Sequence, residues 1–231
     1  MYITLHLKAE RTAHENVITE DSGPATGTRM AARRHAFLEA ATAVFLEKGY
    51  ANTTLADVIA RSGGSLQTLY SLFGSKQGLF EALVAERHAE ALAEVFAPFR
   101  AEDLLDQAPD DVLAAVGTRF LQAIMTPQAL GIYRLVLAES VLMTELAERV
   151  WAMGPAHIRM LVAEYFRQQA RRGTLRLQDP EQAAHQFWGM LLGGSFHMQC
   201  LLGLREAPEP EEIEASVRTA VALFLDGCRA R

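Results

Sequence analysis

Apolar residues recur at helical intervals along most of the chain, and no stretch shows the alternation of apolar and polar residues that is typical of a half-buried β-strand. This periodicity predicts an all-α protein. Ser, Thr, Gly and Pro residues at the edges of the periodic segments mark where helices begin and end. The predicted helices cover about 30–48, 53–62, 65–72, 75–99, 110–125, 128–141, 143–152, 155–172, 180–203 and 209–228.

The same pattern divides the chain into three regions. Residues 1–28 mix charges, Gly and Pro without a period, and they are expected to form a flexible leader. Residues 29–85 form a small helical domain, and residues 86–231 form a larger helical bundle. Because charged residues interrupt the N-terminal segment and the chain has only two cysteines, we expect no export signal and no disulfide framework, and the cytoplasm is the expected compartment.

Charge is distributed unevenly between these regions. The chain of 231 residues has a formal net charge of −6, yet Arg29 to His88 contains seven Lys or Arg against five Asp or Glu, a balance of +2. This mild excess does not by itself indicate binding to nucleic acid. One later segment, Gln182 to Leu204, has the length of a membrane span. Polar residues recur through it and no basic cluster flanks it, so a buried or subunit-interface helix is expected instead, with no membrane partner.

Two short predicted helices flank the Gly63-Gly64 pair, which is the arrangement of a helix-turn-helix unit. Leu69 and Phe73 share one face of the second helix, whereas Gln67, Thr68 and Ser71 project from another sector. Gln, Thr and Ser side chains can hydrogen-bond to base edges or phosphates. An ordinary helical hairpin with a solvated polar face remains the alternative.

The stretch "EKGYANTTLADVIARSGGSLQTLYSLFGSKQGLFEALV" resembles the N-terminal signature of the TetR/AcrR family of transcriptional regulators. The residues that carry the resemblance are Gly49-Tyr50, Thr53-Thr54, Ile59-Ala60, Thr68-Leu69-Tyr70, Phe73, Ser75-Lys76 and Leu79-Phe80. The resemblance covers roughly residues 30–85, and the later half is weakly similar to the effector-binding halves of AcrR- or AefR-like members. It implies a three-helix, helix-turn-helix DNA-binding domain followed by a larger helical bundle for ligand binding and dimerisation.

The resemblance also implies roles for particular residues toward a double-stranded DNA operator. Thr53 or Thr54, Tyr70 and Lys76 would hold phosphates, and Ser65, Gln67, Thr68 and Ser71 would lie closest to the bases. Arg29, Arg33 and Arg34 are expected either to form a basic arm near the minor groove or to be a solvated helix start.

Two positions depart from the family pattern. Gly64 replaces a frequent buried Val, and we expect Leu66 to fill part of the space that this leaves. Gln67 replaces a frequent Gly, and because its amide can read a base edge, we expect it to contribute to an operator preference of this protein's own.

The family resemblance further implies a homodimer and a small-molecule effector. The last two helices are the expected dimer interface, with Gly189, Gly193, Gly194 and Ser195 allowing close approach and Val217, Val221, Phe224 and Leu225 forming a matching stripe. An intrachain core is the alternative for these residues. A lipophilic or aromatic effector is expected in the bundle, and the candidate ligand-binding residues are Phe96, Phe120, Ile124, Leu137, Trp151, Tyr165, Phe166, Trp188 and Met190.

No catalytic motif, metal site or cofactor is expected. His197 and Cys200 stand three residues apart, but they lack the second pair of ligands that a zinc site needs. The sequence therefore favours a ligand-responsive DNA-binding regulator, most simply a repressor that a small hydrophobic or aromatic effector releases from its operator. An all-α adaptor or an enzyme without DNA binding is the alternative.

Overall fold

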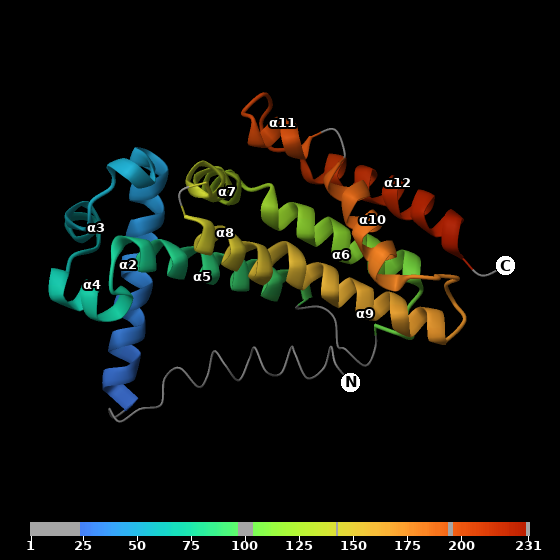
Figure 1. Cartoon of the computed structure of the whole chain (residues 1–231), viewed down its shortest axis with the longest axis horizontal. Coiled ribbons are helices and arrows are strands. Elements are labelled where there is room, and N and C mark those ends of the chain that lie inside the picture. The colour runs from blue at the N-terminus through green and yellow to red at the C-terminus, as the bar shows by residue number, and fades with distance from the viewer. Residues whose placement is uncertain (1–23, 97–103, 142, 194–195, 230–231) are drawn as a thin grey trace. The chain divides into compact units, whose positions relative to one another are not determined.

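The computed structural model describes residues 24–96, 104–141, 143–193 and 196–229. Helices dominate these residues, and outside the helices Leu175 and Arg229 form an isolated β-bridge, so the predicted all-α class is confirmed (Figure 1). The helices are α2 (Pro24–Asn52), α3 (Leu55–Ser62), α4 (Leu66–Phe73), α5 (Lys76–Phe96), α6 (Pro109–Ile124), α7 (Pro127–Glu139), α8 (Thr144–Trp151), α9 (His157–Arg171), α10 (Pro180–Leu192), α11 (His197–Leu201) and α12 (Pro210–Cys228), and η1 (Ala152–Ala156) is a π-helical segment.

Most helix boundaries lie within a few residues of those predicted, but three predictions were wrong. Residues 24–28, expected in a flexible leader, belong to α2, and the rest of that leader lies outside the described residues. A break was expected at Gly154, but the chain forms a π-helical turn there. The wider turn accommodates the proline of this segment, which has no N–H to donate. The helix expected over 180–203 ends at Leu192, because Gly193 stabilises a helix poorly and instead caps α10.

None of the described helices combines the length and the apolar character that crossing a bilayer would require. The uncharged segment from Gln182 to Leu204 is long enough in sequence to span a membrane. In the structure it is not one continuous helix, because α10 ends at Leu192. Its two helical pieces, α10 and α11, bury Phe187, Trp188 and Cys200 in the protein interior.

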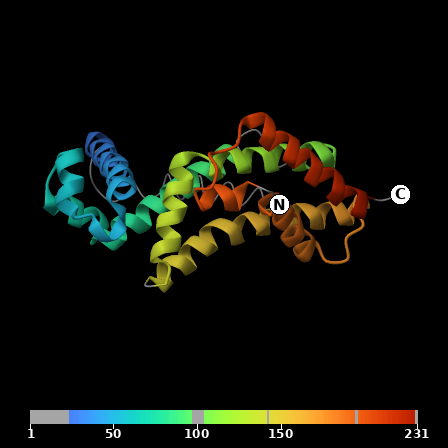
Figure 2. The same ribbon diagram turned by 90° about the horizontal axis from the view of Figure 1, so that it is seen from above.

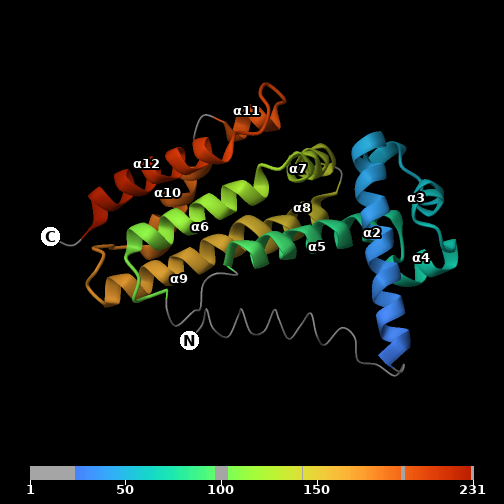
Figure 3. The same ribbon diagram turned by 180° about the vertical axis from the view of Figure 1, so that it is seen from behind.

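The described residues form two compact units, the first of which contains residues 24–87 and 131–148. Within it, α2 packs along α3, with α4 beside them (Figure 3). Its centre is aromatic: the Phe45 ring lies 5.1 Å from that of Phe80 in an edge-on contact. Gly131 brings α7 against α2, since a Cβ atom there would lie 2.5 Å from the Leu46 Cδ2 atom.

The second unit contains residues 88–130 and 149–229 of the described chain. Helix α9 packs on α10 and α6 packs on α12 (Figure 2). These helix pairs enclose a continuous apolar core. Phe166 lies at its centre, stacked on Phe224 at 5.1 Å between ring centroids. Burying an aromatic side chain of this size stabilises a fold by about 1.5–3 kcal/mol.

The turn between α3 and α4 depends on Gly64, whose φ of 95° is a conformation that other L-residues rarely adopt. A Cβ atom on Gly64 would lie 3.1 Å from the Phe37 Cζ atom, so the Phe37 ring already occupies the adjacent space. The expectation that Leu66 fills this space was wrong, because Leu66 is 46% exposed. Phe37 supplies the packing because it reaches the turn from α2, a long-range contact that local spacing does not reveal.

We predict that Gly64→Ala lowers the free energy of unfolding by about 1–2 kcal/mol, because the new side chain is strained at a positive φ. Gly227→Ala is the matched control, since Gly227 is helical and has open space around it. That change should be neutral or slightly stabilising. Urea unfolding followed by circular dichroism measures both. Equal effects of the two substitutions would contradict the strained turn.

Candidate nucleic-acid interface

Helix α3 begins with a complete capping box. The Thr54 hydroxyl accepts the Asp57 N–H at 3.2 Å, and the Asp57 carboxylate accepts the Thr54 N–H at 2.9 Å. Lys48, near the end of α2, donates to the same carboxylate at 2.7 Å. This bond, followed by those from Thr54, lowers the pKa of Asp57 to about 2. The carboxylate therefore stays ionised at neutral pH and fixes the start of α3 beside α2.

Helix α4 is short but firmly seated. Leu69 is fully buried and Phe73 nearly so, which anchors one face of the helix in the core of the first unit. The Ser65 hydroxyl accepts the Thr68 N–H at 3.1 Å and lies 2.8 Å from the Thr68 hydroxyl. The N-cap, the first turn and the two anchors together fix how α4 is rotated about its axis.

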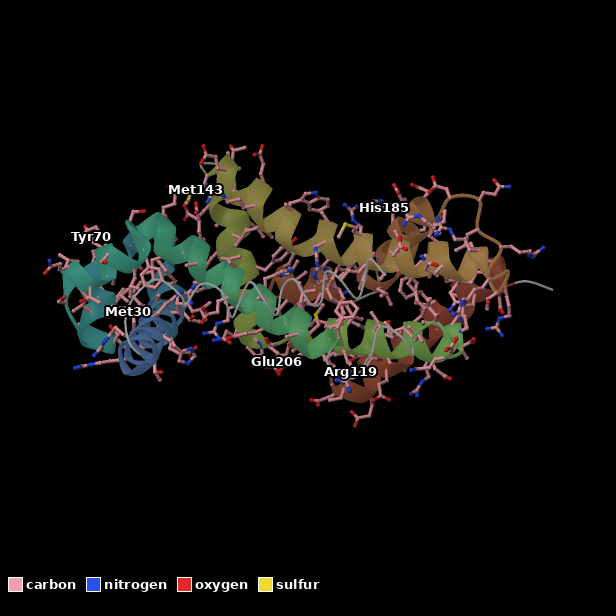
Figure 4. The ribbon with its side chains drawn as sticks, turned by 90° about the horizontal axis from the view of Figure 1, so that it is seen from below. Met30, Tyr70, Arg119, Met143, His185 and Glu206 are labelled. Carbon is pink, nitrogen blue, oxygen red and sulfur yellow. The ribbon has the colours of Figure 1, made fainter. Side chains whose placement is uncertain are left out.

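The opposite face of α4 is exposed. Gln67 and Ser71 project away from the anchors, and Tyr70, which is 49% exposed, lies on one flank at the surface of the unit (Figure 4). Thr68 is half-buried on the other flank. Of the predicted base-reading residues, Ser65, Gln67 and Ser71 are therefore exposed, and Thr68 is half-buried. What they hydrogen-bond to remains a prediction.

The two threonines before α3 differ in their accessibility. Thr53 is 2% exposed, and its hydroxyl donates to the Gly49 carbonyl at 2.8 Å. Thr54 is exposed at the N-terminus of α3, where backbone N–H groups and the helix dipole favour an anion. Of the two alternatives that the sequence left open, Thr53 is buried, whereas Thr54 is exposed and its hydroxyl donates to the Asp57 carboxylate at 2.8 Å. A phosphate contact of Thr54 stays a prediction.

Lys76 has partners inside the first unit. Its ammonium donates to the carbonyls of Tyr50 at 2.8 Å, Thr53 at 2.9 Å and Ala51 at 3.3 Å. It also lies 4.5 Å from the centre of the Tyr50 ring. Lys76 therefore joins the start of α5 to carbonyls at the end of α2, where a cation is favourable. A phosphate contact of Lys76 stays a prediction.

The arginines that open α2 have different surroundings. Arg29 is exposed. Arg33 donates to the Ser62 carbonyl at 3.5 Å, and its guanidinium lies 5.9 Å from the Phe37 ring, beside the turn of the helix-turn-helix. Arg34 forms an ion pair with Glu86. Glu86 offsets the charge of Arg34. The better candidates for a basic arm are therefore Arg29 and Arg33.

The candidate ligand-binding residues do not all come together. Tyr165, Phe166 and Trp188 are buried in the core of the second unit, and Phe96, Phe120 and Ile124 pack against that core. Leu137, Trp151 and Met190 are 48%, 54% and 36% exposed, so the structure does not place them inside it.

Trp188 is the most distinctive member of this aromatic group. Its ring centroid lies 4.4 Å from that of Phe120, and its indole N–H is buried without a hydrogen-bond partner among the described residues. A buried donor without a partner is costly, and it is a candidate contact for a ligand acceptor. In the same core, burial raises the pKa of Tyr165 to about 12.

The predicted dimer residues also divide. Val217, Val221 and Leu225 are at most 4% exposed, so this stripe belongs to the intrachain core and was wrongly assigned to an interface. Phe224 is half-buried against Phe166. Gly189 is exposed on α10 and Gly193 is exposed directly after it, and α12 exposes Leu223, which is 63% accessible. Gly194 and Ser195 lie outside the described residues.

Comparison with known proteins identifies the class to which this fold belongs. The family model described as "Bacterial regulatory proteins, tetR family" matches residues 37–83. The model described as "AefR-like transcriptional repressor, C-terminal domain" matches residues 111–228, about half of the chain. A DNA-binding helix-turn-helix followed by such a domain defines a transcriptional regulator. The chain belongs to the TetR family of transcriptional regulators.

Individual relatives agree with this assignment over most of the chain. The uncharacterized HTH-type transcriptional regulator YvkB of Bacillus subtilis (strain 168) is 24% identical over 84% of this chain and 95% of its own. A proposed TetR-family regulator from Mesorhizobium loti MAFF303099 has a solved structure with a TM-score of 0.75 and 26% identity over 87% of this chain and 98% of its own. The solved structure of the Flavonoid-responsive Regulator FrrA has a TM-score of 0.68 and 23% identity, over 87% of this chain and 99% of its own.

We predict that Lys76→Met destabilises the protein by about 1–2 kcal/mol, because three carbonyl oxygens lose a charged donor. Lys48→Met is the matched control, since it removes the same charge from an exposed ion pair, and it should cost less. Thermal unfolding measures both. A smaller loss for Lys76→Met than for Lys48→Met would contradict the structural role of Lys76.

Proposed function

We propose that this regulator is a repressor that binds a two-fold operator as a homodimer and leaves it when a small hydrophobic or aromatic effector binds. The observation that carries this proposal is the exposed face of α4. That face holds Gln67, Tyr70 and Ser71 on a helix whose other face is anchored by Leu69 and Phe73. A rigid helix with an accessible hydrogen-bonding face has the form that enters a DNA major groove.

Phosphate and base contacts fall to different residues in this proposal. Thr54 and the N-terminus of α3 hold one phosphate, and the phenol of Tyr70 holds another. Gln67 lies nearest the bases, where its amide can pair with both N6 and N7 of an adenine. Ser65, Thr68 and Ser71 supply hydroxyls around it. The phosphate contacts set the position of α4, and the base contacts provide the sequence preference.

A homodimer is needed because α4 contains only eight residues and contacts few base pairs by itself. Two copies related by a two-fold axis can read half-sites about 34 Å apart or a multiple of that distance. The exposed face of α10 and α12 is the proposed contact between copies. Gly189 allows close approach there, since a Cβ atom on it would meet nothing within 4 Å, and Leu223 supplies apolar area.

The effector proposal rests on the aromatic group of the second unit. Phe120 and Trp188 offer aromatic faces, and the buried indole N–H of Trp188 offers one hydrogen bond to an acceptor. An aromatic molecule that carries an oxygen acceptor fits this chemistry. The name of the structural neighbour FrrA, a flavonoid-responsive regulator, agrees with an effector of that kind.

We expect the protein to retard the DNA that lies immediately upstream of its own coding region in a sequence-specific and salt-sensitive manner. Gln67→Ala should weaken binding about 5- to 150-fold for each half-site and flatten the preference at one symmetric pair of operator positions. A panel of single-base operator variants measures this preference. An effector is recognised in the same assay as a compound that removes the retarded band.

Gln107→Ala is the control for this experiment, because Gln107 is exposed in the turn before α6 and lies outside the helix-turn-helix. The base preference of Gln107→Ala should match that of the unchanged protein. An unaltered base preference of Gln67→Ala at every position would remove Gln67 from the readout. Absence of specific retardation of any fragment would overturn the proposed repressor.

We expect Leu223→Glu to shift the monomer–dimer equilibrium toward the monomer by at least about 100-fold, because it places a charge in an apolar contact between copies. Leu137→Glu is the matched control, since Leu137 is also an exposed leucine but belongs to the other unit. Sedimentation at several protein concentrations measures both. An unchanged dimer in Leu223→Glu would exclude this face as the contact.

A further inference from the structure

The helix-turn-helix carries an apolar groove that its own core does not use. Its walls are formed by α3 and α4, and its lining residues are Leu55, Ala56, Ile59, Ala60, Leu66 and Tyr70. Leu66 and Tyr70 are 46% and 49% exposed, although both are large and largely apolar. None of the lining side chains carries a charge at neutral pH. The groove therefore offers its occupant apolar contact and, at its edge, one phenol.

The groove is continuous with the face of α4 that is proposed to read DNA. Leu66 and Tyr70 are four residues apart and share one flank of the helix, and Gln67 follows Leu66 directly. Ser65 caps the helix at its N-terminus, so Leu66 occupies the first turn beside the exposed polar side chains. Whatever contacts Gln67 on this face therefore also lies close to Leu66.

The chemistry of a DNA major groove narrows what Leu66 can contact. Base edges there present hydrogen-bond donors and acceptors, together with one apolar substituent, the C5-methyl group of thymine. A leucine cannot satisfy a donor or an acceptor, and it would leave one desolvated without a partner. Pairing Leu66 with a thymine methyl avoids that cost, because both surfaces are apolar and leave water together.

We propose that this groove, at its Leu66 wall, receives the C5-methyl group of a thymine next to the base that Gln67 reads. The inference rests on the proposed function and makes it more specific. The protein then selects a T·A pair by apolar contact at one position of each half-site, and hydrogen bonds select the neighbouring pair. Leu66 is then a specificity residue, whereas it was expected to fill part of the space beside Gly64.

The test uses operators in which single thymines are replaced by deoxyuridine, which lacks only the methyl group. Burial of one methyl-sized group corresponds to about a four-fold change in affinity. At one symmetric pair of positions, uracil should therefore weaken binding about fifteen-fold when both half-sites are changed. Replacing a cytosine elsewhere by 5-methylcytosine should produce no comparable gain.

Variants assign the effect to a side chain. Leu66→Ala should bind the thymine operator more weakly and lose its preference for thymine over uracil at that position. Leu202→Ala is the matched control, because Leu202 is also an exposed leucine but follows α11 in the second unit. It should keep the full preference. Circular dichroism establishes that the variants are folded.

The possible failures are distinguishable. If binding stays sequence-specific but no uracil substitution weakens it, the methyl contact is overturned and the proposed function stands. If uracil weakens binding equally in Leu66→Ala, another residue makes the contact and the assignment to Leu66 is overturned. If Leu66→Ala alters sedimentation of the free protein, the groove joins copies of the chain instead. If no DNA is bound specifically, the proposed function itself fails.

Discussion

The fixed orientation of α4 is the constraint on which the rest of the molecule depends. An isolated helix of eight residues is unstable in water, because nucleation is costly and few hydrogen bonds follow it. Burial of Leu69 and Phe73 stabilises α4 and also determines which side chains face outward. A rotation of α4 by one residue, about 100°, would move Thr68 or Tyr70 into the buried place of Leu69 and turn Gln67 away from its present direction. Specificity and stability therefore arise from the same packing.

The neighbouring helices hold α4 in place through contacts that are distant in sequence. Phe37 reaches from α2 to the Gly64 turn, and Lys76 joins the start of α5 to the end of α2. Lys48 ties the capping box of α3 to α2. These contacts involve side chains whose residue types alone indicate other roles, such as a phosphate ligand for Lys76. A residue near a DNA-binding surface can thus act mainly by positioning the backbone that meets the DNA.

The sequence predicted the helical class and most helix boundaries because apolar periodicity and capping residues are local signals. In this way Ser65 was expected to cap α4, and either Thr53 or Thr54 to cap α3; the structure has Ser65 and Thr54 at these N-caps. It could not predict which apolar residues stay exposed, since Leu66 differs from Leu69 only in where the neighbouring helices lie. The same limit explains the wrong assignment of Val217 and Leu225. Their spacing fits either a core or an interface, and only the packing of α6 on α12 shows that they are core residues.

Coupling between effector and DNA places a quantitative demand on the proposed mechanism. To reverse an equilibrium from 1:99 to 99:1, a ligand must prefer one conformer by about 5.5 kcal/mol. Helix α5 is the covalent element through which such a preference can pass, because its Leu79 and Phe80 belong to the core of the first unit and its Leu92 and Val95 to that of the second. A ligand that satisfies the buried Trp188 N–H gains a hydrogen bond worth about 1 kcal/mol. Most of the required preference must therefore come from apolar burial, which favours a large aromatic effector over a small polar one.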